Sequence, residues 1–230
     1  MSKFKIVRNI IILVIVIVIG VSVYNFFTQE SVINQTLNNN SEINYDYKTL
    51  LVNYETSLPS DFETEIVEYT DPTGTTVSIS AVIEGALEKL FTAADEDGIK
   101  LKITTAYQTY EQQSLILEET ISRIKKTGYT VDEVLEVSRN YEIAPGSSEF
   151  TTGLVVEFDY YGSTTEEEFN DWFEENAATY GFIMRYPEDK QDITLVDSQE
   201  DIYRYVGKST ATEINELDYC LEEYLAYLDS

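Results

Sequence analysis

The stretch SSEFTTGLVVEFD, residues 147 to 159, joins two different sequence patterns. Its first half is rich in Ser and Thr, whose hydroxyls bond to nearby backbone groups and favour turns. Its second half, 153 to 159, is largely apolar and has the length of a strand. We therefore predict a turn that leads into a buried strand. The hydroxyls of Ser147, Ser148, Thr151 and Thr152 could instead supply a nucleophile, but that role requires a base within reach.

Helical and strand patterns alternate around this stretch without a regular βαβ rhythm. Apolar residues spaced three and four apart predict helices, and alternating or short apolar runs predict strands. We predict an α+β domain with a small, mostly antiparallel sheet covered by helices. Helices are expected at 81–95, 111–128, 130 to about 140, from a capping box at 163–166 to Gly181, and from about 212 onward, and strands at 99–105, 153–159, 182–186 and 203–207.

The composition excludes several kinds of site. The chain has 230 residues, no histidine and one cysteine. Without histidine there is no Ser/His or Cys/His catalytic arrangement and no histidine-based zinc site. Cys220 lies beside an apolar stripe of helical spacing, so we interpret it as a small, half-buried packing residue. The stripe consists of Ile214, Leu217, Leu221, Tyr224 and Leu228.

The chain is strongly acidic. Its formal net charge is -27, and hydrophobic residues make up 43% of it, enough for a core. Anionic lipid and nucleic acid would repel such a surface, so we predict no nucleic-acid partner. The charge could serve solubility alone, or it could attract cations or a basic partner.

The N-terminus predicts a membrane anchor. Lys3, Lys5 and Arg8 precede a nearly continuous apolar run that is close to the minimum length for a membrane-spanning helix. The positive flank places the N-terminus in the cytoplasm and the remainder outside the cell. No small-residue cleavage site follows the run, so an uncleaved anchor is favoured over a signal peptide. The expected parts are a basic flank at 1–8, a transmembrane anchor at 9–27, a flexible linker at 28–47 and an extracellular domain at 48–230.

Five segments of the outer domain together resemble one family. They occur in the family's order and with matching spacing: LLVNYETSLPSDF (50–62), ITTAYQTYEQQ (103–113), PGSSEFTTGLVVEFD (145–159), ENAATYGFIMRYPEDK (175–190) and QEDIYRYVG (199–207). The chain is similar to the VanY-type D-alanyl-D-alanine carboxypeptidases, zinc peptidases that trim the stem peptides of bacterial cell walls. The resemblance implies a D,D-carboxypeptidase-like fold.

The positions that carry the family's chemistry differ in this chain. By the resemblance, Phe150, Glu157 and Ile202 stand where the family has its zinc ligands. Gln199 occupies the position of the catalytic Glu, and Gln108 that of an Arg that contacts substrate. Phe and Ile offer no lone pair, and Gln cannot act as a general base. We therefore expect no catalytic residue, and a cleft lined at the former zinc positions.

The same comparison of positions leads to an expectation of no cofactor. Zinc is predicted to be lost, with an oxygen-ligated cation near Glu157, Asp159 and Glu200 as the alternative. Neighbouring residues on a strand face opposite ways, so these carboxylates need not converge.

The function we expect is that of a membrane-anchored extracellular pseudoenzyme. It would bind a peptidoglycan stem peptide or a segment of a protein partner without hydrolysis, through Gln108, Ser148, Phe150, Gln199 and Ile202. Two alternatives stay open. One is a divergent D,D-carboxypeptidase, a metallopeptidase acting on cell-wall peptides, and the other is a structural spacer or acidic surface protein without a ligand.

Overall fold

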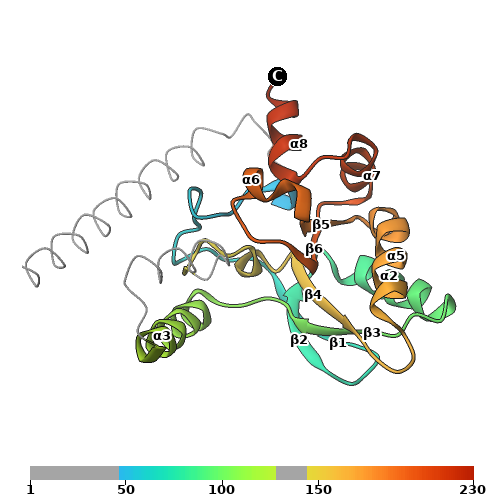
Figure 1. The fold of residues 1–230 in the computed structure, drawn as a ribbon, viewed down its shortest axis with the longest axis horizontal. Helices are drawn as coiled ribbons and strands as arrows, with labels where there is room; N and C mark the ends of the chain where they lie inside the picture. The colour runs from blue at the N-terminus through green and yellow to red at the C-terminus, as the bar shows by residue number, and fades with distance from the viewer. Residues whose placement is uncertain (1–46, 128–143) are drawn as a thin grey trace, which may run out of the picture. The chain divides into compact units, whose positions relative to one another are not determined.

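The computed structural model describes residues 47–127 and 144–230 (Figure 1). The expected anchor at 9–27, almost all of the linker and the short helix expected from 130 lie outside these ranges. No helix within the described ranges is long and apolar enough to cross a membrane. Asp46–Ser230 forms a compact unit by itself.

Helices and strands follow one another along the described chain much as the sequence patterns predict. The α-helices are α2 (Glu84–Glu96), α3 (Tyr110–Thr127), α5 (Glu166–Asn176), α6 (Gln191–Thr194), α7 (Lys208–Leu217) and α8 (Leu221–Leu228). The strands are β1 (Ile66–Thr70), β2 (Thr76–Ser80), β3 (Leu101–Thr105), β4 (Val155–Tyr160), β5 (Phe182–Tyr186) and β6 (Gln199–Tyr205). Short 3-10 helices are η1 (Tyr47–Thr49), η2 (Glu149–Thr152), η3 (Ala177–Tyr180) and η4 (Glu188–Lys190).

Four strands form the main sheet in the order β3-β4-β6-β5, and each neighbouring pair is antiparallel. The register shifts between Ile103 and Thr105 in β3 and between Met184 and Tyr186 in β5. The hairpin of β1 and β2 forms a separate two-stranded sheet. The expectation of an α+β fold with a small, mostly antiparallel sheet is confirmed.

The principal core lies between α2, α5 and one face of the main sheet (Figure 1). Val156 and Phe158 of β4 point to this face, and Val155 and Glu157, which alternate with them, point to the other, as a strand requires. The helices contribute Leu87, Leu90, Phe91 and Ala94 from α2 and Phe169, Trp172 and Phe173 from α5. On the opposite face of the sheet lies a smaller buried cluster of Val155, Tyr186, Val196 and Ile202.

The C-terminal region differs from the single helix expected from about 212. It consists of α7 and α8, because Asp218 adopts a left-handed conformation with φ 55° and ends α7. Ile214, Leu221 and Tyr224 are buried in a second cluster with Ile183 of β5. Leu217 and Leu228 of the expected stripe are exposed. Cys220 is fully buried rather than half-buried.

Two further local features depart from the predictions. The hairpin of β1 and β2 was not predicted. The Asp71 carboxylate orders its turn by accepting from the backbone N–H of Thr73 at 2.8 Å, and ties it to β3 by accepting from the N–H of Ile103 at 3.0 Å. The capping box before α5 is formed by Thr165 and Glu168, two residues later than expected.

Candidate functional site

The segment from Ser148 to Gly153 is a tight turn stabilised by its own side chains. Ser148 caps η2, and its hydroxyl accepts from the backbone N–H of Phe150 at 3.4 Å. Thr152 donates its hydroxyl to the carbonyl of Glu149 at 2.6 Å. Gly153 ends η2 with φ 68°, a left-handed conformation that favours glycine. The hydroxyls of Ser148 and Thr152 thus stabilise the turn, which is the role that the sequence pattern predicts for them.

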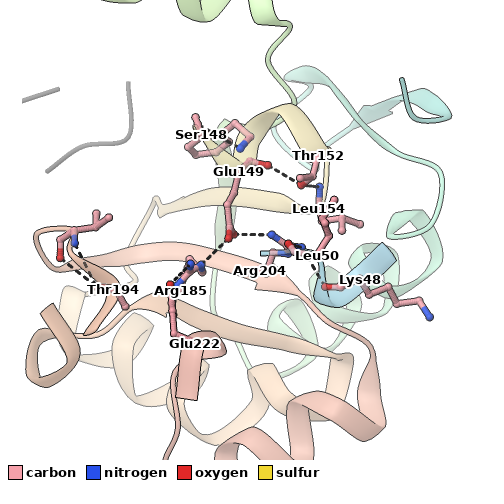
Figure 2. Close-up of polar contacts among 12 residues, drawn as sticks. Lys48, Leu50, Ser148, Glu149, Thr152, Leu154, Arg185, Thr194, Arg204 and Glu222 are labelled. Carbon is pink, nitrogen blue, oxygen red and sulfur yellow. Dashed lines mark hydrogen bonds and ion pairs between the residues drawn. The ribbon is translucent and has the colours of Figure 1, made fainter. Parts of the chain in front are cut away.

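Glu149 turns inward from this segment into a buried ion cluster (Figure 2). Its Oε1 lies 3.0 Å from Nε of Arg185, and its Oε2 lies 2.7 Å from Nη1 of Arg204. The three side chains are between 0% and 1% exposed. A buried charge is tolerated when opposite charges compensate it, so Glu149 depends on both arginines.

Each arginine extends the cluster to another part of the domain (Figure 2). Arg185 donates from Nη1 and Nη2 to the carboxylate of Glu222 in α8, at 3.0 and 2.7 Å. Arg204 donates from Nη2 to the carbonyls of Lys48 and Leu50 at 3.1 and 2.9 Å. The turn before β4 is therefore connected to α8 and to the start of the described chain.

The positions assigned to zinc ligands by the resemblance do come together. Glu157 of β4 and Ile202 of β6 are direct partners in the antiparallel register. Phe150 packs against a cluster that contains Ile202. The other members of that cluster are Val155, Tyr186 and Val196. Two of the three positions thus contribute apolar side chains to one packed group beside Glu157.

Gln108 joins the same region from the connection between β3 and α3. Its backbone N–H donates to the carbonyl of Phe150 at 3.3 Å. Its side-chain carbonyl accepts from Nε2 of Gln113 at 3.1 Å. Gln113 is buried, and its own Oε1 has no hydrogen-bond partner within residues 47–127 and 144–230. Because the carbonyl oxygen of Gln108 already accepts one hydrogen bond from Gln113, the amide N–H groups of Gln108 are its main remaining groups for contact with a ligand.

A cleft of about 570 Å³ is lined by Glu157 and Gln199, whereas the other residues expected at the site, Gln108, Ser148, Phe150 and Ile202, do not line it. Four more carboxylates line it, from Asp159, Glu166, Glu200 and Asp201. Lys102 lies 2.7 Å from Asp159, and the hydrogen bond between the two holds the pKa of that carboxyl below its usual value. Partial burial, together with the charges of Glu157, Asp159 and Glu200, raises the pKa of Asp201. The cleft is thus a polar, negatively charged site.

Sequence reasoning missed the residues that build the support of this site. Arg185 and Arg204 were seen only as parts of family-like segments, and Gln113 was not singled out. A signal exists for Arg185, because it is a charged residue within the apolar strand FIMRY and must find a buried partner. The signal for Arg204 is weaker, because its strand QEDIYRY is largely polar. The sequence does not indicate which of its 42 acidic residues is that partner.

Comparison with known proteins identifies relatives of this domain. The sequence model of the family described as VanY, D-alanyl-D-alanine carboxypeptidase, matches residues 76–208. A D-alanyl-D-alanine carboxypeptidase of Enterococcus faecalis is 34% identical over 181 residues, which are 78% of this chain and 66% of the relative. A D-alanyl-D-alanine carboxypeptidase of Enterococcus faecium is 33% identical over 129 residues, 55% of this chain and 36% of the relative. The chain therefore spans about two thirds and about one third of the lengths of these relatives.

Solved structures resemble the fold over the same region. VanYB in complex with D-alanine-D-alanine has a TM-score of 0.70 and 35% identity, and the match covers 79% of this chain and 98% of VanYB. A mutant of the vancomycin-resistance D,D-pentapeptidase VanY in complex with Zn(II) has a TM-score of 0.69 and 35% identity, with coverages of 78% and 99%. The LdcB LD-carboxypeptidase follows with a TM-score of 0.66 and 29% identity, with coverages of 79% and 88%.

The Zn(II) complex corrects the expectation that no cofactor belongs to this site. That relative holds Zn(II), and neither the expectation of no metal nor that of an oxygen-ligated cation stands. Of Phe150, Glu157 and Ile202 only Glu157 offers a donor atom, and no group of three or more Cys, Asp or Glu side chains converges within the described ranges. The residues at these positions do not fit the three protein ligands of a catalytic zinc site.

Proposed function

We propose, since this chain belongs to the VanY family of D-alanyl-D-alanine carboxypeptidases, that its outer domain binds cell-wall stem peptides and does not hydrolyse them. One observation carries the proposal. The domain keeps the features that hold this region in place, namely the Glu149 ion cluster and the paired register of β4 and β6. In contrast, amide side chains occupy the positions at which the resemblance places the general base and the charged substrate-binding group.

Gln199 argues for binding without hydrolysis. It lies at the start of β6 opposite Tyr186 and lines the cleft beside Glu157. A carboxylate at this position could take a proton from an attacking water, but a carboxamide has no basic oxygen at neutral pH. Gln199 can still donate to a peptide carbonyl and accept from a peptide N–H.

Gln108 argues for a neutral mode of peptide recognition. Its amide, held by Gln113, can donate to a peptide carbonyl, but it lacks the charged fork with which an Arg binds a carboxylate. The carboxylates that line the cleft would also repel the carboxylate of a free peptide C-terminus. We therefore expect the domain to prefer a peptide whose groups in the cleft are neutral or positively charged, with an amidated C-terminus bound more tightly than a free one.

A combined binding and hydrolysis experiment tests the proposal. The purified full chain, in detergent, is titrated calorimetrically with a pentapeptide ending in D-Ala-D-Ala and with its C-terminal amide. In parallel, the acid form is incubated with the protein with and without Zn²⁺, D-alanine release is assayed, and bound metal is measured by elemental analysis. We expect saturable binding and no release of D-alanine in either condition.

Two variants localise the binding. Gln108→Ala removes the proposed donor and should weaken peptide binding about fivefold, as expected for a neutral hydrogen bond. Gln112→Ala is the matched control, because Gln112 is exposed in the first turn of α3 and its side chain accepts from the backbone N–H of Thr109. Release of D-alanine would support the alternative of a divergent D,D-carboxypeptidase. Absence of both binding and release would contradict both peptide functions.

We also propose that residues 9–27 anchor the chain in the cell membrane with the domain outside. The support is the apolar run and its positive flank. In membranes of expressing cells, the full chain should resist extraction by alkaline carbonate. External protease should digest the domain in intact cells, and a domain protected until the cells are lysed would contradict this orientation.

A further inference from the structure

A second cavity, of about 310 Å³, lies between α5, α7 and the edge strand β5. Its apolar lining includes Phe173, Phe182, Met184 and Ile214. It shares Asn170 and Glu200 with the acidic cleft but is otherwise lined by different residues. Its volume is at the lower end of the range for small-molecule sites, so a ligand of a few heavy atoms would fit.

Tyr203 gives this cavity a polar group that the fold does not use. The side chain lines the cavity, is 1% exposed, and packs its ring against Phe158 and Phe173. Its hydroxyl has no hydrogen-bond partner within the described residues. An unsatisfied buried hydroxyl costs free energy, so a partner supplied by a ligand would recover a stabilising interaction.

The charged residues that line the cavity are acidic. Glu174, Glu200 and Asp218 contribute to the lining, and none of the described residues that line it is basic. Burial, with the charges of Glu200, Asp201 and Glu174, raises the pKa of Tyr203, so the phenol stays neutral and remains a hydrogen-bonding group at physiological pH. The cavity therefore combines an apolar wall, one buried hydroxyl and carboxylates of one sign.

We propose that this cavity binds a primary ammonium group carried on a short aliphatic stem. The stem would pack against Phe173, Phe182 and Ile214, and the ammonium would donate to the Tyr203 hydroxyl and to the Glu174 carboxylate. Met184, the flexible unbranched side chain of the lining, is the group we expect to move as the ligand reaches the hydroxyl. Free alkylamines and lysine side chains of peptides share this chemistry.

Methionine labelling provides a direct test on the full chain. The sequence has two methionines, so ¹³C-methyl labelling gives one signal from the cavity, from Met184, besides that of Met1. The labelled protein in detergent micelles is titrated with pentylammonium chloride and with 1-pentanol, its neutral counterpart of equal size, against protein-free micelles. We expect a saturable shift of the Met184 signal and an affinity for pentylammonium about tenfold higher than for 1-pentanol, because hydrogen bonds to charged groups are the stronger ones.

Variants assign the binding to the two polar groups. Tyr203→Phe and Glu174→Gln should each weaken pentylammonium binding severalfold, and Tyr203→Phe should not lower thermal stability because it removes an unsatisfied hydroxyl. Tyr205→Phe, on the same face of β6 but outside the cavity, should bind like the unaltered protein. N-acetyl-lysine N-methylamide distinguishes a lysine side chain from a free amine as the source of the ammonium. No saturable shift, equal affinity for 1-pentanol, or unchanged affinity in Tyr203→Phe would overturn the proposal.

Discussion

Glu149 and Arg185 form an ion pair from which solvent is excluded, with Oε1 of the carboxylate 3.0 Å from Nε of the guanidinium. Arg204 forms an ion pair with the second carboxylate oxygen of Glu149, and Glu222 forms one with Nη2 of Arg185. Two cations and two anions therefore alternate through the interior (Figure 2). The arrangement fixes the turn that carries Phe150, since Glu149 is its immediate neighbour.

Replacing Glu149 by Gln should destabilise the domain by about 3 to 5 kcal/mol, because it leaves two buried guanidinium groups without their shared anion. Unfolding by urea can be followed through the fluorescence of Trp172, the single tryptophan, which is buried in the principal core. Asp159→Asn is the control. It breaks a partly exposed pair with Lys102 and should cost no more than about 1 kcal/mol. Equal losses in the two variants would mean that the cluster does not support the fold.

The fold was predictable where local pattern and tertiary packing agree. The apolar runs near 153–159 and 182–186 became β4 and β5, because their side chains enter buried clusters. The hairpin of β1 and β2 was missed because its turn depends on Asp71, whose second bond reaches β3. The break between α7 and α8 was missed because an Asp adopts the left-handed conformation where no Gly or Pro signals it.

The site was predictable only in part, and chiefly through the resemblance. The five motifs indicated that Phe150, Glu157 and Ile202 would lie together, and the register of β4 and β6 and the packing of Phe150 bring them together. The contact between Gln108 and Gln113 depends on how α3 leaves β3 and has no sequence signal of its own. The expectation of no cofactor was wrong, because it rests on the ligand positions of this chain alone. A solved relative holds Zn(II).

Two glycine variants should change stability in opposite directions. At Gly153, a Cβ would lie 2.8 Å from the backbone nitrogen of Ser80, and φ is +68°. Gly153→Ala should therefore destabilise the domain by more than about 1 kcal/mol, because it combines strain with a clash against backbone. Gly85 lies in the first turn of α2 with nothing within 4 Å of an added Cβ. Gly85→Ala should stabilise by about 0.5 to 1 kcal/mol, and the same urea titration measures both.

Asp201 should make the domain less stable as pH rises. Burial and the neighbouring Glu157, Asp159 and Glu200 raise its pKa in the folded state above the ordinary value of 3.8. The folded state therefore binds this proton more tightly than the unfolded state, so its contribution to stability is lost as pH rises through the folded pKa. Asp201→Asn should raise the melting temperature relative to the unaltered protein at pH 7 but not at pH 3.

The opposite behaviour is expected of Asp159, which serves as the comparison. Its pKa is lowered by the hydrogen bond with Lys102, so its contribution to stability is present above the ordinary value and is lost as pH falls through the folded pKa. Asp159→Asn should lower the melting temperature at pH 7 and have less effect at pH 3. The prediction for Asp201 fails if its variant gains no stability at neutral pH.

Cys220 should be chemically inert in the folded protein. Burial, with repulsion by Glu222 and Glu223, raises the pKa of its thiol to about 11. The thiolate is the reactive form, so its fraction at pH 8 should be about two orders of magnitude below that of an unperturbed thiol. Labelling with iodoacetamide followed by mass spectrometry should give little product unless urea is added, and the unfolded chain should then take up one label. Rapid labelling without urea would place the thiol at an accessible surface.

Gln113 should control peptide binding through Gln108 without stabilising the fold. It is buried, its Nε2 is bound to the side-chain carbonyl of Gln108, and its Oε1 has no partner among the described residues. Gln113→Leu keeps most of the volume and removes the unsatisfied oxygen, so the free energy of unfolding should be unchanged or higher. The freed Gln108 side chain would have to be ordered by the ligand itself, so affinity for the pentapeptide should fall about fivefold. A loss of stability with unchanged affinity would assign Gln113 to the core instead, and would remove Gln108 from the proposed site.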